Sequence, residues 1–480
     1  MIYRFIIMGI LLVGGYINVF SQALFVQSNI SDTLSEGKDL RMVTIDNIFI
    51  TGNVKTKLKI ILRELSIEKG KSYNYYELKE ILKADRDKVF NTRLFNDVRV
   101  EMLELSYDRV DVVVQLDERW YLFPIPLLDF ADRNFNDWWV NHNHDFGRLI
   151  YGMKLYHFNM RGMNERMTLT AQFGYSHQFS IDYEFPYIDK SQRLGLRFFV
   201  KYIENKNVHY NNIENKRVFL DSEKLLRTNW FTGVNLTRRN SFYTRHHLEF
   251  TFSNTHVVDS ILTLNPNYNL NGSNTQNYFS LSYTFDQDKR DITAYPLKGF
   301  QMEVKVQKDG LGLFNDINKT SIRANYSRYV DLKKGWYFSN YSSVYLSTPK
   351  FQPYSVVKGL GFKNDVIRGY ELFVIHGQDY YLNRTTIKKR ILGGATKIKK
   401  IPIKQFQYFP YAIYLKTYAD LGYARNTQRY EGNSFLADKL LVGTGIGVDF
   451  VTFYDMVFRF EYSINGEGQS GLFFSVENEF

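Results

Sequence analysis

The sequence predicts an all-β transmembrane barrel of 16 antiparallel strands, preceded by one small α+β domain. Apolar and polar side chains alternate with period two from Trp120 to the end of the 480-residue chain. The chain contains 39 Phe and 36 Tyr, yet its mean hydropathy is only -0.33. Both features are typical of a barrel that turns alternate side chains toward lipid. After the N-terminal stretch no apolar run approaches about 18 residues, which excludes a polytopic helical membrane protein.

The composition excludes several chemistries. Because the chain has no Cys, a disulfide scaffold, a thiolate zinc site, an iron–sulfur cluster and a cysteine nucleophile are all ruled out. The net charge of +11 would make nucleic acid the first partner to consider for a soluble protein. The export-type N-terminus argues against nucleic acid. A positive rim would instead face anionic outer-membrane lipid and lipopolysaccharide, although ordinary solvation of the charges is the simpler explanation.

The N-terminus has the order of a secretory signal. Arg4 is followed by the apolar stretch 5–20 and then by small residues at Ser21 and Ala23. We therefore expect residues 1–23 to be a signal peptide, cleaved at Gln22 or Ala23, and the mature chain to be exported. An uncleaved anchor helix over the apolar stretch is the alternative, but the stretch is short for a membrane span.

Residues 40–118 predict a small unit with the element order β-α-α-β-β. A β-branched run over 42–50 ends at a turn signal, Thr51-Gly52-Asn53. Two apolar stripes at helical spacing follow. The first consists of Leu58, Ile61, Leu62 and Leu65, and the second of Leu78, Ile81, Leu82 and Val89. Two alternating strands, 98–102 and 110–116, complete the unit, which at about 80 residues has a core just large enough to fold alone.

The remaining residues, 121–480, divide into 16 alternating segments with no expected helix. The segments lie at about 121–131, 149–159, 165–175, 177–187, 192–204, 225–238, 242–256, 277–287, 298–309, 319–331, 335–346, 376–392, 408–420, 438–450, 454–464 and 470–480. In one of them Phe300 and Val304 alternate with Glu303 and Lys305. We expect the apolar faces to meet lipid and the charged faces to line a hydrated lumen. Long polar loops mostly alternate with tight turns, as in an outer-membrane barrel.

Several motifs, taken in order, are similar to those of one known family. The N-terminal unit carries Ile50-Thr51-Gly52-Asn53, Thr92-Arg93-Leu94-Phe95-Asn96-Asp97-Val98 and Glu118-Arg119-Trp120. The barrel carries Asp288-Lys289-Arg290-Asp291 with Pro296 and Gly299, then Val366-Ile367-Arg368-Gly369-Tyr370, then Tyr418-Ala419-Asp420-Leu421-Gly422, and it ends in Phe480. The chain resembles the BamA and TamA superfamily of outer-membrane assembly and translocation proteins, also called the bacterial surface antigen family. The resemblance covers nearly the whole mature chain.

This resemblance implies both the domain organisation and the sites. Residues 40–118 would form one periplasmic POTRA domain, and residues 121–480 would form the barrel in the outer membrane of a Gram-negative bacterium. Arg368 would lie on a long loop that folds back into the lumen, with Asp420 as its partner. The implied site residues are the loop motif Val366, Arg368, Gly369 and Tyr370, the strand partners Asp420 and Gly422, the periplasmic turn Asp288, Arg290, Asp291, Pro296 and Gly299, and the C-terminal barrel signal Phe474, Val476 and Phe480.

The implied function is the insertion or translocation of other polypeptides, or of lipids, without catalysis. The POTRA domain would receive unfolded outer-membrane or secreted clients by β-augmentation, and the seam between the first and last strands would open or thin the membrane. Accessory lipoproteins are further expected partners. Two alternatives stay open, a passive pore or structural surface protein, and a dedicated secretion partner of one client. The single POTRA unit argues against a general assembly machine, and Asn478 stands where a hydrophobic residue is usual.

Of two sets of neighbouring histidines, only His142 and His144 form a candidate pair for a metal site. His142 and His144 could direct two imidazoles to one side of a loop, but spacing fixes no third ligand, so we favour a solvated polar loop. His246 and His247 are adjacent on a strand and therefore face opposite ways.

The lysine-rich segment near residue 400 predicts a solvated periplasmic turn, with contact to lipid phosphates as the alternative. It contains Lys397, Lys399, Lys400 and Lys404, beside Lys388, Lys389 and Arg390. No phosphate-binding loop, nucleophile turn or metal-binding helix motif occurs in the sequence. We therefore expect no catalytic residue, no cofactor and no metal.

Overall fold

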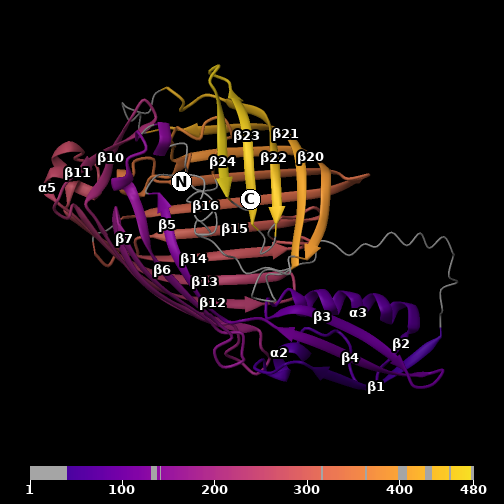
Figure 1. Ribbon diagram of the computed structural model, residues 1–480. Coiled ribbons are helices and arrows are strands. Elements are labelled where there is room, and N and C mark those ends of the chain that lie inside the picture. The colour runs from indigo at the N-terminus through magenta and orange to yellow at the C-terminus, as the bar shows by residue number, and fades with distance from the viewer. Residues whose placement is uncertain are drawn as a thin grey trace, which may run out of the picture.

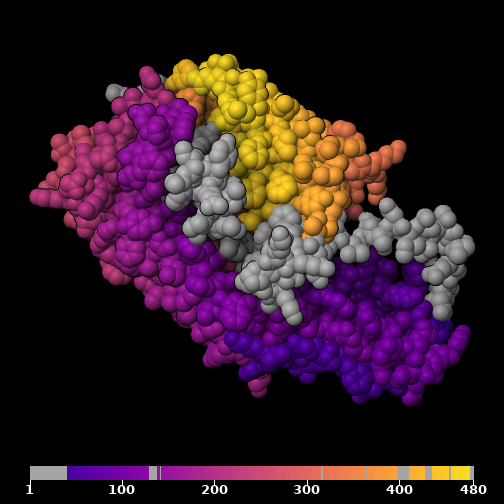
Figure 2. Space-filling model, in the orientation of Figure 1, coloured from indigo at the N-terminus to yellow at the C-terminus, as the bar shows by residue number. Residues whose placement is uncertain are grey.

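A computed structural model describes residues 41–476, apart from 131–137, 141, 294, 315–316, 363–364, 398–407, 428–434 and 453–455. The expected signal peptide, Asn478 and Phe480 lie outside these residues. The described chain forms a small N-terminal α/β unit and a large curved sheet, and the unit forms a lobe against one end of the sheet (Figures 1 and 2). No helix in the described part of the chain is both long and apolar enough to cross a membrane.

The large sheet contains all 16 predicted strands. They are β5 (Leu122–Phe130), β6 (Leu149–Phe158), β7 (Arg166–Gly174), β8 (Ser176–Phe185), β9 (Leu194–Asn205), β12 (Arg227–Arg239), β13 (Thr244–Val257), β14 (Thr275–Asp288), β15 (Gly299–Asp309), β16 (Lys319–Lys333), β17 (Trp336–Thr348), β20 (Asp379–Lys397), β21 (Tyr408–Arg425), β22 (Leu441–Thr452), β23 (Val457–Asn465) and β24 (Ser470–Val476). Each strand pairs antiparallel with its neighbour in this order. The sheet curls so that β5 and β24 both lie on the near side in Figure 1. The predicted fold class is confirmed.

The two faces of the sheet divide as the alternation predicts. On β23, Phe460, Tyr462 and Ile464 are exposed on the outer face, whereas Arg459 and Glu461 are buried on the inner face. Phe460 packs against Phe474 of β24 with ring centroids 5.0 Å apart. The outer face is therefore an apolar surface suited to lipid, and the inner face is a polar lumen.

The N-terminal unit has one more strand than predicted. Its elements are β1 (Met42–Thr51), α2 (Leu58–Leu62), β2 (Ser72–Asn74), α3 (Tyr75–Phe90), β3 (Phe95–Glu104) and β4 (Arg109–Glu118), with the sheet order β2-β1-β4-β3. Strand β2 was not predicted, because its three residues are too few to show alternation. Asn74 caps α3 by accepting hydrogen bonds from the backbone N–H groups of Tyr76 and Glu77.

The two helices of this unit differ in how well the sequence predicted them. In α3 the predicted stripe is correct, because Leu78, Leu82 and Val89 are buried. In α2 it is only half right, because Ile61 and Leu65 pack in the core, whereas Leu58 and Leu62 are exposed and Ile60 is buried instead. Helix α2 has only five residues, which is too short for a long apolar stripe to set its orientation. The packing of the helix in the domain therefore decides which of its side chains are buried.

The N-terminal unit docks on the end of the barrel where the tight turns lie, here called the turn side. Glu64 forms a bidentate ion pair with Arg239 of β12, with oxygen–nitrogen distances of 2.8 and 2.9 Å. The Arg63 guanidinium lies 3.8 Å from the centroid of the Tyr187 ring. Thr56 accepts a hydrogen bond from the Asn159 side chain at 2.9 Å. Three turns of the barrel therefore hold one end of the unit.

Tyr121 lies at the junction between the two parts. Its hydroxyl donates to the Leu94 carbonyl and lies 3.1 Å from the Thr56 hydroxyl. Burial raises the pKa of Tyr121 to about 12, so the phenol stays protonated and remains a hydrogen-bond donor.

The opposite end of the barrel, here called the loop side, carries structure that the sequence analysis treated as polar loops. These elements are η1 (Phe146–Arg148), the hairpin β10 (Asn207–Ile213) and β11 (Lys216–Asp221), α5 (Asp259–Leu264), η2 (Leu270–Gly272), η3 (Tyr354–Val356), β18 (Gly359–Leu360) and β19 (Ile375–His376). The expectation of no helix beyond residue 121 is therefore wrong, for example at α5, a short helix that buries Ile261. At the hairpin tip, Asn215 donates to the Val374 carbonyl and accepts from the Leu436 N–H. This tip thus ties two other loops together.

The core of the N-terminal unit supplies a stability prediction. A fragment spanning residues 41–120 should unfold cooperatively in solution, and Leu78→Ala should lower its free energy of unfolding by about 2–5 kcal/mol because a fully buried side chain is lost. Leu103→Ala, at a half-exposed position, is the control and should change it by less than about 0.5 kcal/mol. Urea denaturation followed by circular dichroism measures both. An aggregated or non-cooperative fragment would contradict the boundary proposed for this domain.

Candidate functional site

The described part of the loop between β17 and β20, residues 349–362 and 365–378, enters the lumen. Its side chains Ile367 and Tyr370 are buried in an apolar cluster with Leu382 of β20 and Leu441 of β22. Within the loop, Asp365 pairs with Arg323 of β16 through one carboxylate oxygen. Its second carboxylate oxygen accepts a hydrogen bond from the Tyr380 hydroxyl at 2.9 Å. The loop is therefore packed against both apolar and charged side chains of the barrel wall.

Arg368 lies at the centre of this loop and contacts Asp420 of β21 through three hydrogen bonds. The guanidinium Nε and Nη2 donate to the two carboxylate oxygens at 2.9 and 2.6 Å, and the Arg368 backbone N–H donates to Oδ2 at 3.0 Å. Asp420 is fully buried and Arg368 is 8% exposed. This fork geometry is specific to arginine, because a lysine ammonium cannot contact both oxygens in one plane.

Three further groups surround the Arg368 guanidinium. Its centre lies 3.9 Å from the centroid of the Tyr418 ring. Nη2 donates to the Thr386 hydroxyl at 3.0 Å, and Nη1 lies 3.6 Å from a carboxylate oxygen of Glu461. The charge is thus compensated by two carboxylates and one aromatic face, which is what a buried guanidinium requires.

A chain of ion pairs extends from this arginine toward the turn side. Lys416 lies 2.8 Å from Glu461 and 2.7 Å from Asp449 of β22. Asp449 also accepts from Arg459 at 3.2 Å, and its second oxygen accepts from the Tyr295 hydroxyl at 2.9 Å. Because Tyr295 belongs to the segment 288–299, the network connects the loop motif to the predicted turn motif.

Lys416, Asp449 and Tyr295 are members of this network that were not identified from the sequence. Lys416 and Asp449 lie on different strands at positions that no motif marks, and only the inward phase of the alternation could have placed them in the lumen. Lys388, expected beside a solvated turn, is instead buried in the lumen. It is 1% exposed, and its ammonium lies 4.0 Å from the centroid of the Tyr295 ring, because its position on β20 directs the side chain inward.

Glycines on the barrel wall make room for the loop. A Cβ atom at Gly443 of β22 would lie 1.8 Å from the Arg368 carbonyl oxygen, and one at Gly422 would lie 2.1 Å from Ile367 Cδ1. Gly369 has a φ of 94°, a conformation that other residues rarely adopt. Its carbonyl accepts from the Asn465 side chain at 2.9 Å. The loop backbone therefore lies directly against β21, β22 and the end of β23.

The remaining members of the loop motif also lie close to the barrel wall. Val366 is partly buried, and the Tyr370 hydroxyl accepts a hydrogen bond from the Gly466 N–H at 3.2 Å. Gly466 follows β23 directly, so Tyr370 contacts the hairpin that ends the barrel.

The predicted turn motif forms a compact structure between β14 and β15. Asp288 pairs with Arg290 at 2.7 Å, and Asp291 accepts from the Leu297 N–H at 3.0 Å. Gly299 has a φ of 99°, and a Cβ there would lie 2.0 Å from the Lys289 carbonyl oxygen. Pro296 is buried beside Tyr295. The motif residues thus shape the turn, and Tyr295 carries the contact with the lumen network.

The other candidate residues lie apart from this site. His144 stacks on Trp139 at 4.8 Å and His142 lies edge-on to Phe219 at 5.5 Å, so the two imidazoles contact different partners. Within the described residues no group of three or more His, Cys, Asp or Glu side chains is placed to hold a metal.

The adjacent histidines of β13 face opposite ways, as their position on a strand requires. His246 contacts the Tyr283 hydroxyl at 2.7 Å on the outer face, and His247 contacts Thr237 in the lumen. Of the C-terminal signal, Phe474 lies on the outer face and Val476 ends the last described strand. The side chains of Lys397, Lys399, Lys400 and Lys404 lie outside the described residues.

Gly443→Ala tests the close approach of loop and wall. The added methyl group would overlap the Arg368 carbonyl, so the loop should shift and become accessible to protease while the barrel still forms. Gly394→Ala on β20 is a matched control, because its nearest neighbour would be the Tyr411 hydroxyl at 3.4 Å. Limited proteolysis of the folded protein in detergent measures the rate of loop cleavage. Equal cleavage of both variants and wild type would contradict the packing described above.

Two family models match this chain, one in the barrel and one in the N-terminal unit. The model of the Omp85 superfamily domain matches residues 159–480, and the model of the POTRA domain, described as a surface antigen variable number repeat, matches residues 43–119. No curated protein matches the sequence.

Solved structures are similar in fold at low sequence identity. BamA from Haemophilus ducreyi lacking POTRA domains 1–3 is 12% identical with a TM-score of 0.53, over 90% of this chain and 83% of that chain. CdiB from Acinetobacter baumannii is 12% identical with a TM-score of 0.50, over 91% of this chain and 74% of that chain. CdiB from Escherichia coli is 10% identical with a TM-score of 0.50, over 94% and 93%. This chain belongs to the Omp85 superfamily of outer-membrane insertases and translocases, and it carries one POTRA domain.

Proposed function

We propose that this protein inserts or translocates unfolded outer-membrane or secreted polypeptides without catalysis, with its POTRA domain in the periplasm. The superfamily assignment supports the general class, since its members are transporters and insertases of the outer membrane. The proposal concerns the specific action on polypeptide clients, the orientation of the POTRA domain and the role of the loop motif.

The observation that carries the proposal is the buried pair between Arg368 and Asp420. Breaking one partner of a buried pair typically costs about 3–5 kcal/mol because a charge is left uncompensated. A passive barrel wall does not require such a contact on a loop. The pair holds the loop against β21 and β22, close to the last strands of the barrel. Such a contact fits a protein whose action depends on the shape of the barrel wall at these strands.

The POTRA domain offers an edge for client binding. β3 lies at one edge of its sheet, and an extended client segment could add to such an edge by β-augmentation. At the other end of the pathway, β5 and β24 are the two terminal strands of the barrel sheet. Opening between these strands would give a client strand or a lipid access to the membrane.

The alternative of a passive pore is less well supported. The loop and its charged network fill the lumen beside β20–β23, and the POTRA domain lies across the turn side. A dedicated secretion partner of one client and a role in lipid transport are both compatible with the fold. Accessory lipoproteins and contacts with lipopolysaccharide belong to the same proposal.

Depletion of the protein separates these functions. An insertase should show reduced amounts of many outer-membrane barrels, whereas a dedicated partner should show loss of one secreted or surface protein. Quantitative proteomics of outer-membrane fractions after depletion gives the measurement, with inner-membrane proteins as the internal control. An unchanged outer-membrane proteome together with ion conductance by the purified protein would refute the proposal in favour of a pore.

Charge changes at the loop test its role in function. Arg368→Ala should assemble in the membrane but support client delivery poorly, and Arg368→Asp should be worse because it adds a carboxylate beside Asp420 and Glu461. The swap Arg368→Asp with Asp420→Arg should restore little, because Glu461 and the Tyr418 ring remain placed for a cation at the loop. Arg328→Ala, on the outer face of β16, is the control. Complementation of a depletion strain measures these effects, and full activity of Arg368→Ala would show that the pair is dispensable.

A further inference from the structure

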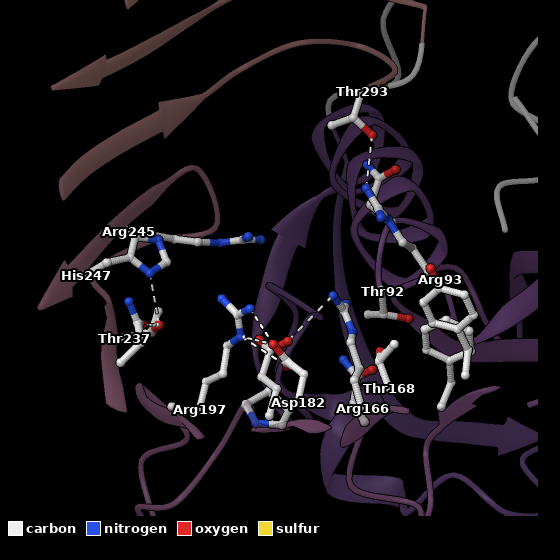
Figure 3. A pocket seen from close by; sticks show the side chains of 18 of the residues that line it. Thr92, Arg93, Arg166, Thr168, Asp182, Arg197, Thr237, Arg245, His247 and Thr293 are labelled. Carbon is white, nitrogen blue, oxygen red and sulfur yellow. Dashed lines mark hydrogen bonds and ion pairs between the residues drawn. The ribbon is translucent and has the colours of Figure 1, made fainter. Parts of the chain in front are cut away.

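The half of the lumen that the loop does not fill contains a large cavity. Its volume is about 1730 Å³, and it lies between the POTRA domain and the inward faces of β6–β9 and β12–β15. Thr92 and Arg93 of the POTRA domain border it, and Arg93 donates to Thr293 of the β14–β15 turn at 3.3 Å (Figure 3). The ion pair between Glu64 and Arg239 holds the POTRA domain at the mouth of this cavity.

Positive charge predominates in the lining. Thirteen Arg and Lys residues line the cavity against eight Asp and Glu residues. This balance differs from the loop network, in which carboxylates and cations alternate and compensate each other. A cleft with excess charge of one sign and low-dielectric walls attracts ligands of the opposite sign.

The arginines that face the cavity come from several different strands. Arg197 of β9 is held by Asp182 of β8, with Nε 2.8 Å from the carboxylate. Arg166 of β7 is only loosely paired, because the Glu184 carboxylate lies 3.9 Å away. Arg245 of β13 projects beside His247 (Figure 3) and its side chain is exposed to the cavity. Arg166 and Arg245 therefore have the capacity to bind a further anion.

The other lining side chains favour a peptide over a lipid. Hydroxyl and amide groups, including those of Thr168, Thr170, Gln172, Gln178 and Thr237, interrupt the apolar side chains of the wall. Such groups can bind the backbone and polar side chains of an extended chain, whereas acyl chains need a continuous apolar surface. The volume also exceeds the roughly 300–1,000 Å³ of pockets that hold small molecules.

We propose that this cavity binds an extended, acidic segment of the client polypeptide, held by Arg166 and Arg245 beneath the POTRA domain. The inference rests on the proposed function, since it assumes that the protein handles polypeptides. It adds a substrate class, namely clients with clustered Asp and Glu residues, and a site separate from the loop network.

Peptide binding to the purified full-length protein in detergent tests the inference. The probe is a fluorescent peptide that alternates Asp and Glu with Ser, and the comparison peptide has Asn and Gln in place of the acids. Fluorescence anisotropy should show about tenfold tighter binding of the acidic peptide at low salt, and the difference should shrink as ionic strength rises. Equal affinity for the two peptides would overturn the proposal.

Paired charge reversals locate the site. Arg166→Glu with Arg245→Glu should weaken binding of the acidic peptide by about tenfold or more, because two attractive contacts become repulsive. Arg238→Glu with Arg328→Glu makes the same change in net charge on the outer face and should leave binding within about twofold. Arg166→Lys with Arg245→Lys should retain binding, and heat-modifiable migration on gels confirms that each variant is folded. Equal loss in the inner and outer pairs would overturn the assignment.

The absence of Cys allows a direct mapping of the bound peptide. Thr168→Cys in the cavity should crosslink to a bromoacetyl derivative of the acidic peptide, and Leu248→Cys on the outer face of β13 should not. Lipopolysaccharide added as a competitor should not displace the peptide, and complete displacement would reassign the cavity to lipid phosphates. If the peptide does not bind while depletion still removes client proteins, this inference fails and the proposed function stands. If binding is found but depletion has no effect on any client, the proposed function fails instead.

Discussion

A chain that crosses lipid as strands must satisfy every backbone N–H and C=O group inside its own sheet, and the rest of this structure depends on that constraint. Sixteen strands pair in sequence order, so each strand has one apolar face toward lipid and one face toward the interior. The interior then receives all the charged side chains that the alternation places there. Those that the folded lumen buries must be compensated by partners of opposite charge or by hydrogen bonds.

The two halves of the lumen solve this problem differently. Beside β20–β23, the inward loop brings Arg368 to Asp420 and Glu461, and Lys416 and Asp449 extend the same balance toward Tyr295. The cost of burying each charge is offset by a neighbour of opposite sign. Beside β6–β15, no comparable loop is present among the described residues, and a cavity with excess positive charge remains. Packing and charge therefore divide one barrel into a filled half and a hollow half.

The docking of the POTRA domain relates these halves to the turn side of the barrel. Its contacts with the barrel involve Glu64, Arg63 and Thr56, all at one end of the domain. Strand β3 forms one edge of the POTRA sheet. Arg93, which precedes β3, contacts the turn between β14 and β15. A client that bound the domain would thus lie near both the cavity and the turn whose Tyr295 contacts Asp449.

The sequence alone determined those features of the protein that follow from a pattern of neighbouring residues. Period-two alternation located all 16 strands and the orientation of residues such as Phe460 and Glu461, because on a strand the side-chain direction follows from position. Motif resemblance supplied the pairing of Arg368 with Asp420. Tertiary structure decided those features that depend on contacts between distant segments. In the N-terminal unit these are the burial of Ile60 instead of Leu58 and the short strand β2. In the barrel they are the burial of Lys388 and the network through Lys416 and Asp449. Those side chains lie on separate strands whose distance in space is set by the curvature of the sheet and the path of the loop, and neither quantity is encoded in local spacing.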